Sequence, residues 1–264
     1  MPSVKRAAVV THGHTENVST AVERLRSVAA KAGVELLEAN DDAAADIAIV
    51  LGGDGTMLRA LARFLGTPVS VLGVNFGRVG FLTALAGDEL EAGLARVFAG
   101  EYRTVELPTV ELELDGRRHV GVNDAVVTSA VLGRMIELGY AIGGEDLGVQ
   151  PCDGLICATP PGSTAYNLSN GGPVLVWGLD AMVVTFVAPH TLHARPLVVG
   201  RDVDVVVENR SPDIPAGVLV DGHHLGDLAP GSATTIHLGP ERSRLAILPE
   251  QTFFKRYGQV FGPG

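Results

Sequence analysis

The sequence predicts two kinds of structure in one chain: a Rossmann-like α/β domain first, then an antiparallel, sandwich-like β domain. Strand and helix patterns alternate over the first hundred residues, which favours a parallel sheet. Beyond them, short runs of β-type residues are separated by Gly, Pro and Asp, which favours antiparallel β structure. A length of 264 residues suits two modest domains. We expect the first to span residues 1–100 and the second 101–248.

In the first domain, the helices carry apolar residues at helical spacing and the strands are short apolar runs. Gly33 follows the first helix where a C-terminal cap belongs. Residues 47–51 form a continuous apolar run, as in a strand covered on both faces. The expected elements are strands at 6–11, 34–38, 47–51 and 69–74 and helices at 16–32 and 57–65.

In the second domain, Val110, Leu112 and Leu114 alternate with acidic residues, and Asp115-Gly116 is a turn signal. One helical interruption is expected near residues 164–170. Further strands are expected at 120–127, 135–142, 182–187, 203–208, 233–238 and 244–248, with another inside 154–159.

Charge and composition exclude several classes of function. The net charge is −10 and the 20 Lys and Arg residues are scattered, so nucleic acid is not an expected partner. No apolar run reaches the length of a membrane span, and the first residues lack the apolar segment of a signal peptide. Two cysteines, Cys152 and Cys157, are too few for a disulfide framework or a zinc site. We expect a cytoplasmic protein.

Gly52-Gly53-Asp54-Gly55-Thr56 lies between an expected buried strand and an expected helix. Ligands of α/β sheets bind at the carboxyl ends of strands, where glycines and free helix amides admit phosphates. Thr56 is expected to cap the helix. The carboxylate of Asp54 would be repelled by bound phosphates, so its presence points to a base for an attacking hydroxyl or to a metal ligand.

The loop is neither of the two best-known nucleotide motifs. No G-x-x-x-x-G-K-[ST] sequence occurs, and Gly53-Asp54-Gly55 is followed at the third position by Leu58 where the dinucleotide fingerprint has glycine. A second Gly-rich segment, residues 73–82, carries Arg78, which is either a phosphate contact or a solvated loop charge. Asn123-Asp124 suits either hydrogen bonds to a sugar or a β-bulge.

Residues 152–175, CDGLICATPPGSTAYNLSNGGPVL, complete a series of motifs. Together with the GGDGT loop, Asn75 to Phe81, Asn123-Asp124, Arg195-Pro196-Leu197 and Asp221-Gly222, they resemble the NAD kinase family over roughly residues 47–225. That resemblance implies a kinase that transfers the γ-phosphate of ATP, or phosphate from polyphosphate, to the adenosine-ribose 2′-hydroxyl of NAD, giving NADP. GGDGT alone is shared with lipid kinases and phosphofructokinases; GSTAY with GGP downstream is specific.

The resemblance also implies roles for individual residues. Asp54 is implied as the general base. The cofactor-binding set is implied as Gly52, Gly53, Gly55, Thr56, Leu58, Arg59, Arg78, Phe81, Asn123, Asp124, Arg134, Asp153, Thr164, Ala165, Tyr166, Ser169, Ala188, His190 and His223. Some of these contacts are implied to cross a subunit boundary. The implied assembly is a homodimer or homotetramer, with an active site between the domains and residues 249–264 returning to the first domain.

No residue is an evident metal ligand, so a divalent cation, Mg²⁺, is expected to be carried by the nucleotide phosphates. Three departures from the family pattern concern substrate preference: Pro161 stands in place of threonine, Asp124 in place of the commoner glutamate, and His223 in place of glutamine. Pro161 lacks both a hydroxyl and an N–H donor.

Two other functions share part of this pattern. A lipid or sphingoid kinase shares GGDGT, but the segment GVNFGRVGF lacks the G-[ST]-x-N-D pattern that is typical of such kinases. A non-catalytic dinucleotide sensor would gain nothing from a carboxylate beside phosphates, which makes Asp54 an argument against it. A serine hydrolase is excluded because Ser163 lacks the G-x-S-x-G elbow.

Overall fold

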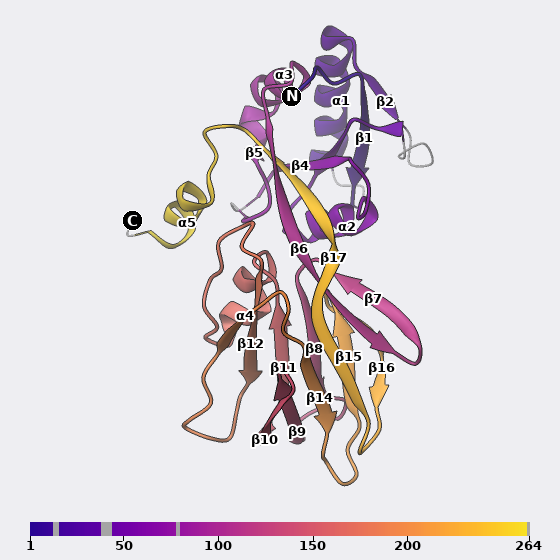
Figure 1. Ribbon diagram of the computed structural model, residues 1–264. Helices are drawn as coiled ribbons and strands as arrows, with labels where there is room; N and C mark the ends of the chain where they lie inside the picture. The colour runs from indigo at the N-terminus through magenta and orange to yellow at the C-terminus, as the bar shows by residue number, and fades with distance from the viewer. Residues whose placement is uncertain (13–15, 38–43, 78–79, 263–264) are drawn as a thin grey trace. The chain divides into compact units, whose positions relative to one another are not determined.

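A computed structural model describes residues 1–264 except 13–15, 38–43, 78–79 and 263–264. The chain forms two compact units (Figure 1). Unit 1 comprises Met1–Glu106 and Ser243–Gly264, and unit 2 comprises Leu107–Arg242. The chain passes between them within two long strands, β6 (Arg103–Leu114) and β17 (Ala233–Ile247).

Unit 1 is built on a parallel sheet, as expected for its βαβ pattern. Every residue of β3 is buried, which confirms a central strand covered on both faces. The order is β4-β3-β1-β2, with β5 and the end of β17 also paired to β4. The strands are β1 (Arg6–Thr11), β2 (Glu35–Leu37), β3 (Ile47–Leu51), β4 (Ser70–Asn75) and β5 (Leu85–Ala86).

The helices of unit 1 are α1 (Glu16–Ala32), α2 (Asp54–Arg63), α3 (Leu90–Phe98) and α5 (Phe253–Phe261), with a short turn η2 (Gly87–Glu89) before α3. α1 and α3 lie side by side (Figure 1). Gly33 has φ +67°, which confirms the cap after α1. The sequence pattern did not reveal α3 or α5.

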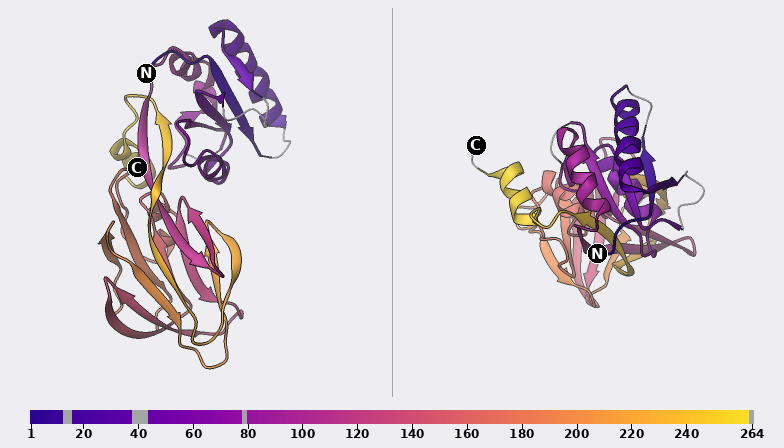
Figure 2. Two further views of the ribbon diagram at one scale, coloured as in Figure 1. Left: turned by 45° about the vertical axis from the view of Figure 1, so that its right-hand side comes forward. Right: turned by 90° about the horizontal axis from the view of Figure 1, so that it is seen from above.

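Unit 2 consists of two antiparallel sheets, which confirms the predicted fold class, and its strands are seen in two layers in Figure 2. One layer has the order β10-β9-β14-β17, with β6 on β17 and β7 on β6. The other has the order β13-β12-β11-β8-β15-β16 and is called sheet B below. Their strands are β7 (Arg117–Gly121), β8 (Asp124–Ser129), β9 (Ile136–Ile142), β10 (Glu145–Cys152), β11 (Gly154–Ala158), β12 (Ala181–Val187), β13 (Leu197–Gly200), β14 (Val205–Asn209), β15 (Ala216–Val220) and β16 (His223–Leu228).

The core of unit 2 is formed by apolar side chains from both layers. Val110, Leu112 and Leu114 are buried, as their alternation predicts, and Asp115-Gly116 makes the following turn with positive φ at both residues. Cys152 and Cys157 are free thiols inside this core. Within the described part of the chain, no helix is long and apolar enough to cross a membrane.

Two strand predictions for unit 2 were wrong in their boundaries. The single run expected at 120–127 is two strands, because the chain leaves β7 at Gly121 and enters β8 at Asp124. The two strands expected at 233–238 and 244–248 are one, β17, which continues through Gly239-Pro240. The expected helical interruption is present as η3 (Gly162–Thr164) and α4 (Tyr166–Ser169).

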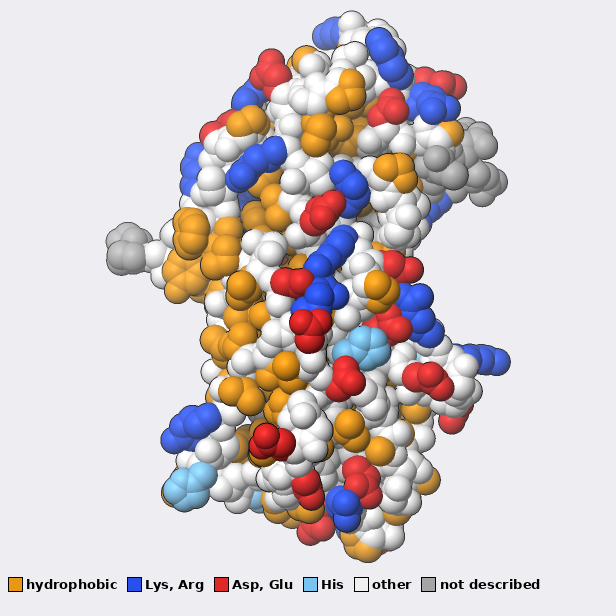
Figure 3. Space-filling view, in the orientation of Figure 1, with side chains coloured by type: hydrophobic (Ala, Val, Ile, Leu, Met, Phe, Trp, Pro, Cys, Tyr) orange, Lys and Arg blue, Asp and Glu red, His pale blue; other side chains and the backbone are white. Residues whose placement is uncertain are grey.

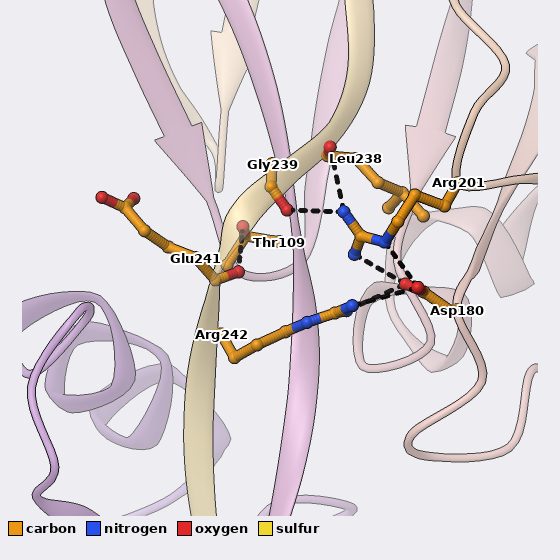
Figure 4. A network of polar contacts seen from close by, with 7 residues as sticks. All are labelled: Thr109, Asp180, Arg201, Leu238, Gly239, Glu241 and Arg242. Atoms are coloured by element: carbon orange, nitrogen blue, oxygen red, sulfur yellow. Dashed lines mark hydrogen bonds and ion pairs between the residues drawn. The ribbon is translucent and has the colours of Figure 1, made fainter.

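An ion cluster ties the two layers of unit 2 together (Figure 4). Asp180, just before β12, accepts hydrogen bonds from Arg201, just after β13, and from Arg242 in β17. Arg201 also donates to the carbonyl oxygen of Gly239 at 3.0 Å. The two guanidinium groups hold the pKa of Asp180 well below its usual range.

Candidate active site

The Gly-rich loop connects the end of β3 to the start of α2. Gly52 N donates to Val74 O at 2.9 Å, which ties the loop to β4. Gly53 is the N-cap, and the amide of Thr56 donates to Gly53 O at 3.0 Å. Thr56 therefore lies inside the helix, so the expectation that it caps the helix was wrong. Because Gly53 starts the helix, α2 begins three residues earlier than expected.

The physical reason for glycine differs between the positions of this loop. A Cβ at Gly52 would lie 2.7 Å from Thr56 Oγ1, so packing within the chain excludes a side chain there. At Gly53 and Gly55 an added Cβ would meet no atom within 4 Å, and neither residue has positive φ. Neither the backbone conformation nor the protein's own packing requires glycine at these two positions. Gly53 is also the N-cap, where glycine is favoured over alanine; close approach of a ligand to the backbone is a further physical reason, and for Gly55 it is the remaining one.

Asp54 occupies the first position of α2, and its carboxylate is held by the backbone that follows β4. Phe81 N donates to Oδ2 at 2.8 Å and Leu82 N donates to Oδ1 at 3.1 Å. A Cβ at Gly80 would lie 2.5 Å from Asp54 Cγ, so only glycine permits this approach. Each carboxylate oxygen keeps a further lone pair that can accept from a substrate hydroxyl.

The segment that holds Asp54 is braced by α5. The ring of Phe81 is buried against Phe253 and Phe261, with ring centroids 6.1 Å and 5.4 Å away. Arg256 donates to Thr83 O. Burial lowers the pKa of Arg256, and the nearby carboxylates of Asp54 and Glu89 oppose that shift. The contribution of Phe81 to Asp54 thus comes from its amide, while its ring is committed to the C-terminal helix.

Two further predicted residues of unit 1 lie on α2: Leu58 is partly buried and Arg59 is exposed. Arg59 Nη1 lies 2.6 Å from Nδ1 of His12, which follows β1. A guanidinium only donates, so the imidazole of His12 accepts. Arg78 lies outside the described residues.

Asn123 and Asp124 stand at the start of β8 and are fixed from two sides. The carboxylate of Asp221 accepts from the amides of both, and Thr159 N donates to Asn123 O at 2.8 Å. Asn123 Oδ1 is buried and, among the described residues, has no hydrogen-bond partner. Burial, together with the charge of Asp221, raises the pKa of Asp124 to about 7. A buried unpaired acceptor is costly unless a ligand supplies the donor.

The GSTAY block lies at the same end of sheet B. Asp124 pairs with Ala158 at the end of β11, and η3 and α4 follow directly. Thr164 Oγ1 donates to Pro161 O at 3.0 Å, and Ser163 Oγ donates to Pro160 O at 2.6 Å while accepting from Leu175 N. Ser163 is therefore a structural residue. The predicted residues that share this end are Asn123, Asp124, Thr164, Ala165, Tyr166, Ser169 and His223.

The other predicted residues of unit 2 lie at the opposite end of sheet B. Asp153 precedes β11, and its carbonyl accepts from Ser129 N at the end of β8. His190 N donates to Pro151 O at 2.8 Å, and Ala188 has φ +42°. Arg134 follows Ser129 and is exposed. Since β11 of five residues spans about 13 Å, one chain does not bring these four residues to Asn123 and Asp124.

Sequence reasoning missed three residues that build these sites. Gly80 belongs to the second Gly-rich segment, residues 73–82. Its closeness to Asp54 depends on the pairing of β3 with β4 in the folded chain. Asp221 belongs to one of the motifs that carry the family resemblance, but no site role was predicted for it. Thr159, whose Oγ1 donates to Val122 O at 2.6 Å, lies in the block of residues 152–175, but no site role was predicted for it.

Comparisons with known proteins identify the family of the chain. The family model of the ATP-NAD kinase N-terminal domain matches residues 6–102, and that of the ATP-NAD kinase C-terminal domain matches residues 122–248. The chain is 39% identical to the NAD kinase of Gemmatimonas aurantiaca over 233 residues, 84% of this chain and 79% of that one. It is 34% identical to the NAD kinase of Moorella thermoacetica over 261 residues, 96% of this chain and 83% of that one.

Solved structures show the same fold. The crystal structure of an NAD kinase from Archaeoglobus fulgidus in complex with ATP has a TM-score of 0.80 and 27% identity, covering 98% of this chain and 100% of that one. Yeast NADH kinase complexed with NADH has a TM-score of 0.86, covering 98% of this chain and 88% of that one; at 20% identity it supports the fold alone. From the two domain matches and the curated relatives, the chain belongs to the ATP-NAD kinase family.

Proposed function

We propose that this chain, an NAD kinase that phosphorylates NAD to NADP with ATP, uses Asp54 as the general base toward the ribose 2′-hydroxyl. The observation that carries the proposal is the pair of amide hydrogen bonds from Phe81 and Leu82, which hold the carboxylate of Asp54 in one position within the Gly-rich loop. Phosphoryl transfer passes through a loose transition state, so the base chiefly orients the hydroxyl and takes its proton late.

The proposal divides the work between two parts of the chain. Residues 1–100 with 249–264 handle phosphates, through the backbone of Gly53 and Gly55 and the N-terminus of α2. Residues 101–248 bind the dinucleotide, with Asn123 and Asp124 as its ribose and adenine contacts. The two free thiols, Cys152 and Cys157, suit a reducing cytoplasm.

In this proposal the divalent cation is bound to ATP, the phosphoryl donor. Among the described residues, no three His, Cys, Asp or Glu side chains come together as ligands for a metal ion. The described residues therefore fit no protein cage for Mg²⁺, and a cation arriving with ATP would be held by the phosphates, whose charge it neutralises. The chain itself would contribute the backbone amides that bind the phosphates and the carboxylate of Asp54 that positions the hydroxyl.

The test is direct. Purified protein with Mg-ATP and NAD is expected to form NADP, detected with an NADP-specific dehydrogenase. A panel that replaces ATP by polyphosphate, and NAD by NADH or diacylglycerol, assigns donor and acceptor. Tight NADP binding without turnover under all donors would contradict the enzyme and favour the dinucleotide sensor.

We also propose a homo-oligomer, dimer or tetramer, in which a second copy supplies Arg134, Asp153, Ala188 and His190. The separation of these residues from Asn123 along sheet B supports it. Two edge strands of unit 2, one in each layer, expose apolar side chains: Leu147 and Val149 on β10, Leu197 and Val198 on β13. Such edges are normally covered.

Subunit mixing tests this arrangement. Asn123→Ala and Asp153→Asn are expected to be weakly active alone. After dissociation and reassembly together, hybrid oligomers would contain some sites with both partners intact, and part of the activity would return. Activity that stays at the sum of the separate variants, or a monomeric sedimentation coefficient, would contradict a shared site.

A further inference from the structure

The carboxylate of Asp221 makes an unusual number of contacts with one short stretch of backbone. Val122 N donates to Oδ2 at 2.8 Å, while Asn123 N and Asp124 N donate to Oδ1 at 2.7 Å and 3.2 Å. In return, Asp221 N donates to Asp124 O at 3.0 Å. These four bonds fix the chain at the point where it enters β8.

The turn that contains Asp221 does not account for this carboxylate. Asp221 and Gly222 both have positive φ, as in a type I′ hairpin, where asparagine serves as well as aspartate. The charge is costly, since burial raises the pKa of Asp221 and only the three amides and His223 oppose the shift. A Cβ at Gly121 would lie 2.7 Å from Val220 Cγ1 and 3.1 Å from Asp221 Oδ1, so glycine leaves room for this turn.

The carboxylate of Asp221 fixes residues 122–124, which include a hydrogen-bond acceptor that no described residue satisfies. Asn123 Oδ1 is buried and lacks a partner among the described residues. Thr159 fixes the same stretch from its other side, through the carbonyl oxygens of Val122 and Asn123. The orphan oxygen is thus held in place before any ligand arrives.

We propose that Asp221 is a positioning residue for the dinucleotide: it fixes residues 122–124 so that Asn123 Oδ1 meets a hydroxyl or amino donor of the adenosine moiety. This rests on the proposed function, in which Asn123 contacts that part of NAD. Asp221 itself touches no substrate. Its loss therefore affects the dinucleotide and leaves the phosphoryl donor's site unchanged.

Two substitutions of Asp221 are expected to weaken the hold on residues 122–124 to different extents. In Asp221→Ala all three amides lose their acceptor. In Asp221→Asn the retained Oδ1 can still accept from Asn123 and Asp124, while the amide nitrogen faces Val122 N, another donor. The matched control is Asp227→Asn in β16 of the same hairpin, which removes only the exposed pair with His224.

We expect KM for NAD to rise roughly tenfold or more in Asp221→Ala and less in Asp221→Asn, while KM for ATP stays within about twofold in both. Asp227→Asn is expected to match wild type. Calorimetric titration with NAD, at a temperature where each variant is fully folded by circular dichroism, separates positioning from stability. Should Asp221→Ala fail to fold, Asp221→Asn carries the test.

Wild-type NAD affinity in folded Asp221→Ala, or in Asp221→Asn if that is the variant that folds, would overturn the proposal. So would equal increases of KM for NAD and for ATP. Because the titration measures binding directly, wild-type protein that binds NAD without forming NADP would contradict the kinase function and leave the role of Asp221 to be judged by affinity.

Discussion

Gly80 lies against the carboxylate of Asp54 so closely that a single added Cβ would come within 2.5 Å of Asp54 Cγ. Gly80→Ala is therefore expected to displace the carboxylate and lower kcat by at least about tenfold, because misplacing a catalytic group by an ångström is costly. The measurement is the rate of NADP formation at saturating NAD and ATP. Gly258→Ala is the control, since a Cβ there meets no atom within 4 Å. Unchanged kcat in Gly80→Ala would show that the position of Asp54 is unimportant.

Asp54→Asn is expected to retain most NAD affinity and lose kcat by roughly 10²-fold or more, the usual contribution of a general base. The carboxamide keeps one acceptor for the amides of Phe81 and Leu82, and its nitrogen opposes the other. Thermal unfolding should therefore be recorded alongside NAD titration and kcat. Wild-type turnover in this variant would exclude Asp54 as the base.

Gly53→Ala is expected to lower the melting temperature only slightly, because its Cβ would occupy open space and only the poorer N-cap preference of alanine is lost. If the phosphates of ATP approach this backbone, KM for ATP should rise while KM for NAD changes little. Gly52→Ala provides the contrast: its Cβ would collide with Thr56, so stability should fall. A Gly53→Ala variant with wild-type KM for ATP would place the phosphates elsewhere.

The protonation of Asp124 should leave a pH-dependent signature in stability. Its pKa is raised to about 7 by burial and by Asp221, so the folded protein binds this proton more tightly than the unfolded chain. The stabilisation is complete below the ordinary aspartate pKa and is lost as pH rises to about 7. Asp124→Asn should therefore melt higher relative to wild type at pH 8 than at pH 5. A pH-independent difference between the two proteins would contradict this assignment.

Asp180→Asn should destabilise unit 2 by about 1 kcal/mol at neutral pH, near the upper end for exposed ion pairs, since it weakens two arginine contacts at once. The pKa of Asp180 is depressed, so this contribution persists above the ordinary aspartate pKa and disappears as pH falls through the folded value. Urea unfolding at pH 7 and at pH 3, where part of the contribution is already lost, measures it. Asp213→Asn, an exposed carboxylate of the same unit, is the control.

Figure 3 shows apolar side chains gathered over α5, where Phe254, Tyr257 and Phe261 are exposed. No helix was predicted for this segment, although its aromatic residues Phe253, Tyr257 and Phe261 recur at helical spacing. Phe81, far away in the sequence, supplies the surface against which Phe253 and Phe261 pack. Short helices take their stability from such tertiary contacts, which local propensity does not contain.

The sequence by itself determined the class of fold, the GGDGT loop and the kinase family, because apolar periodicity and motif order are local properties of the chain. It also placed Asp54 at the carboxyl end of a strand. Only the tertiary structure decided which groups hold that carboxylate, since the amides of Phe81 and Leu82 reach it through the pairing of β3 with β4. The same is true of Asp221, whose side chain meets Asn123 through the pairing of β8 with β15. The structure also placed the predicted dinucleotide residues at two opposite ends of sheet B. Motifs that precede and follow the same strand lie far apart, because a strand rises about 3.3 Å per residue.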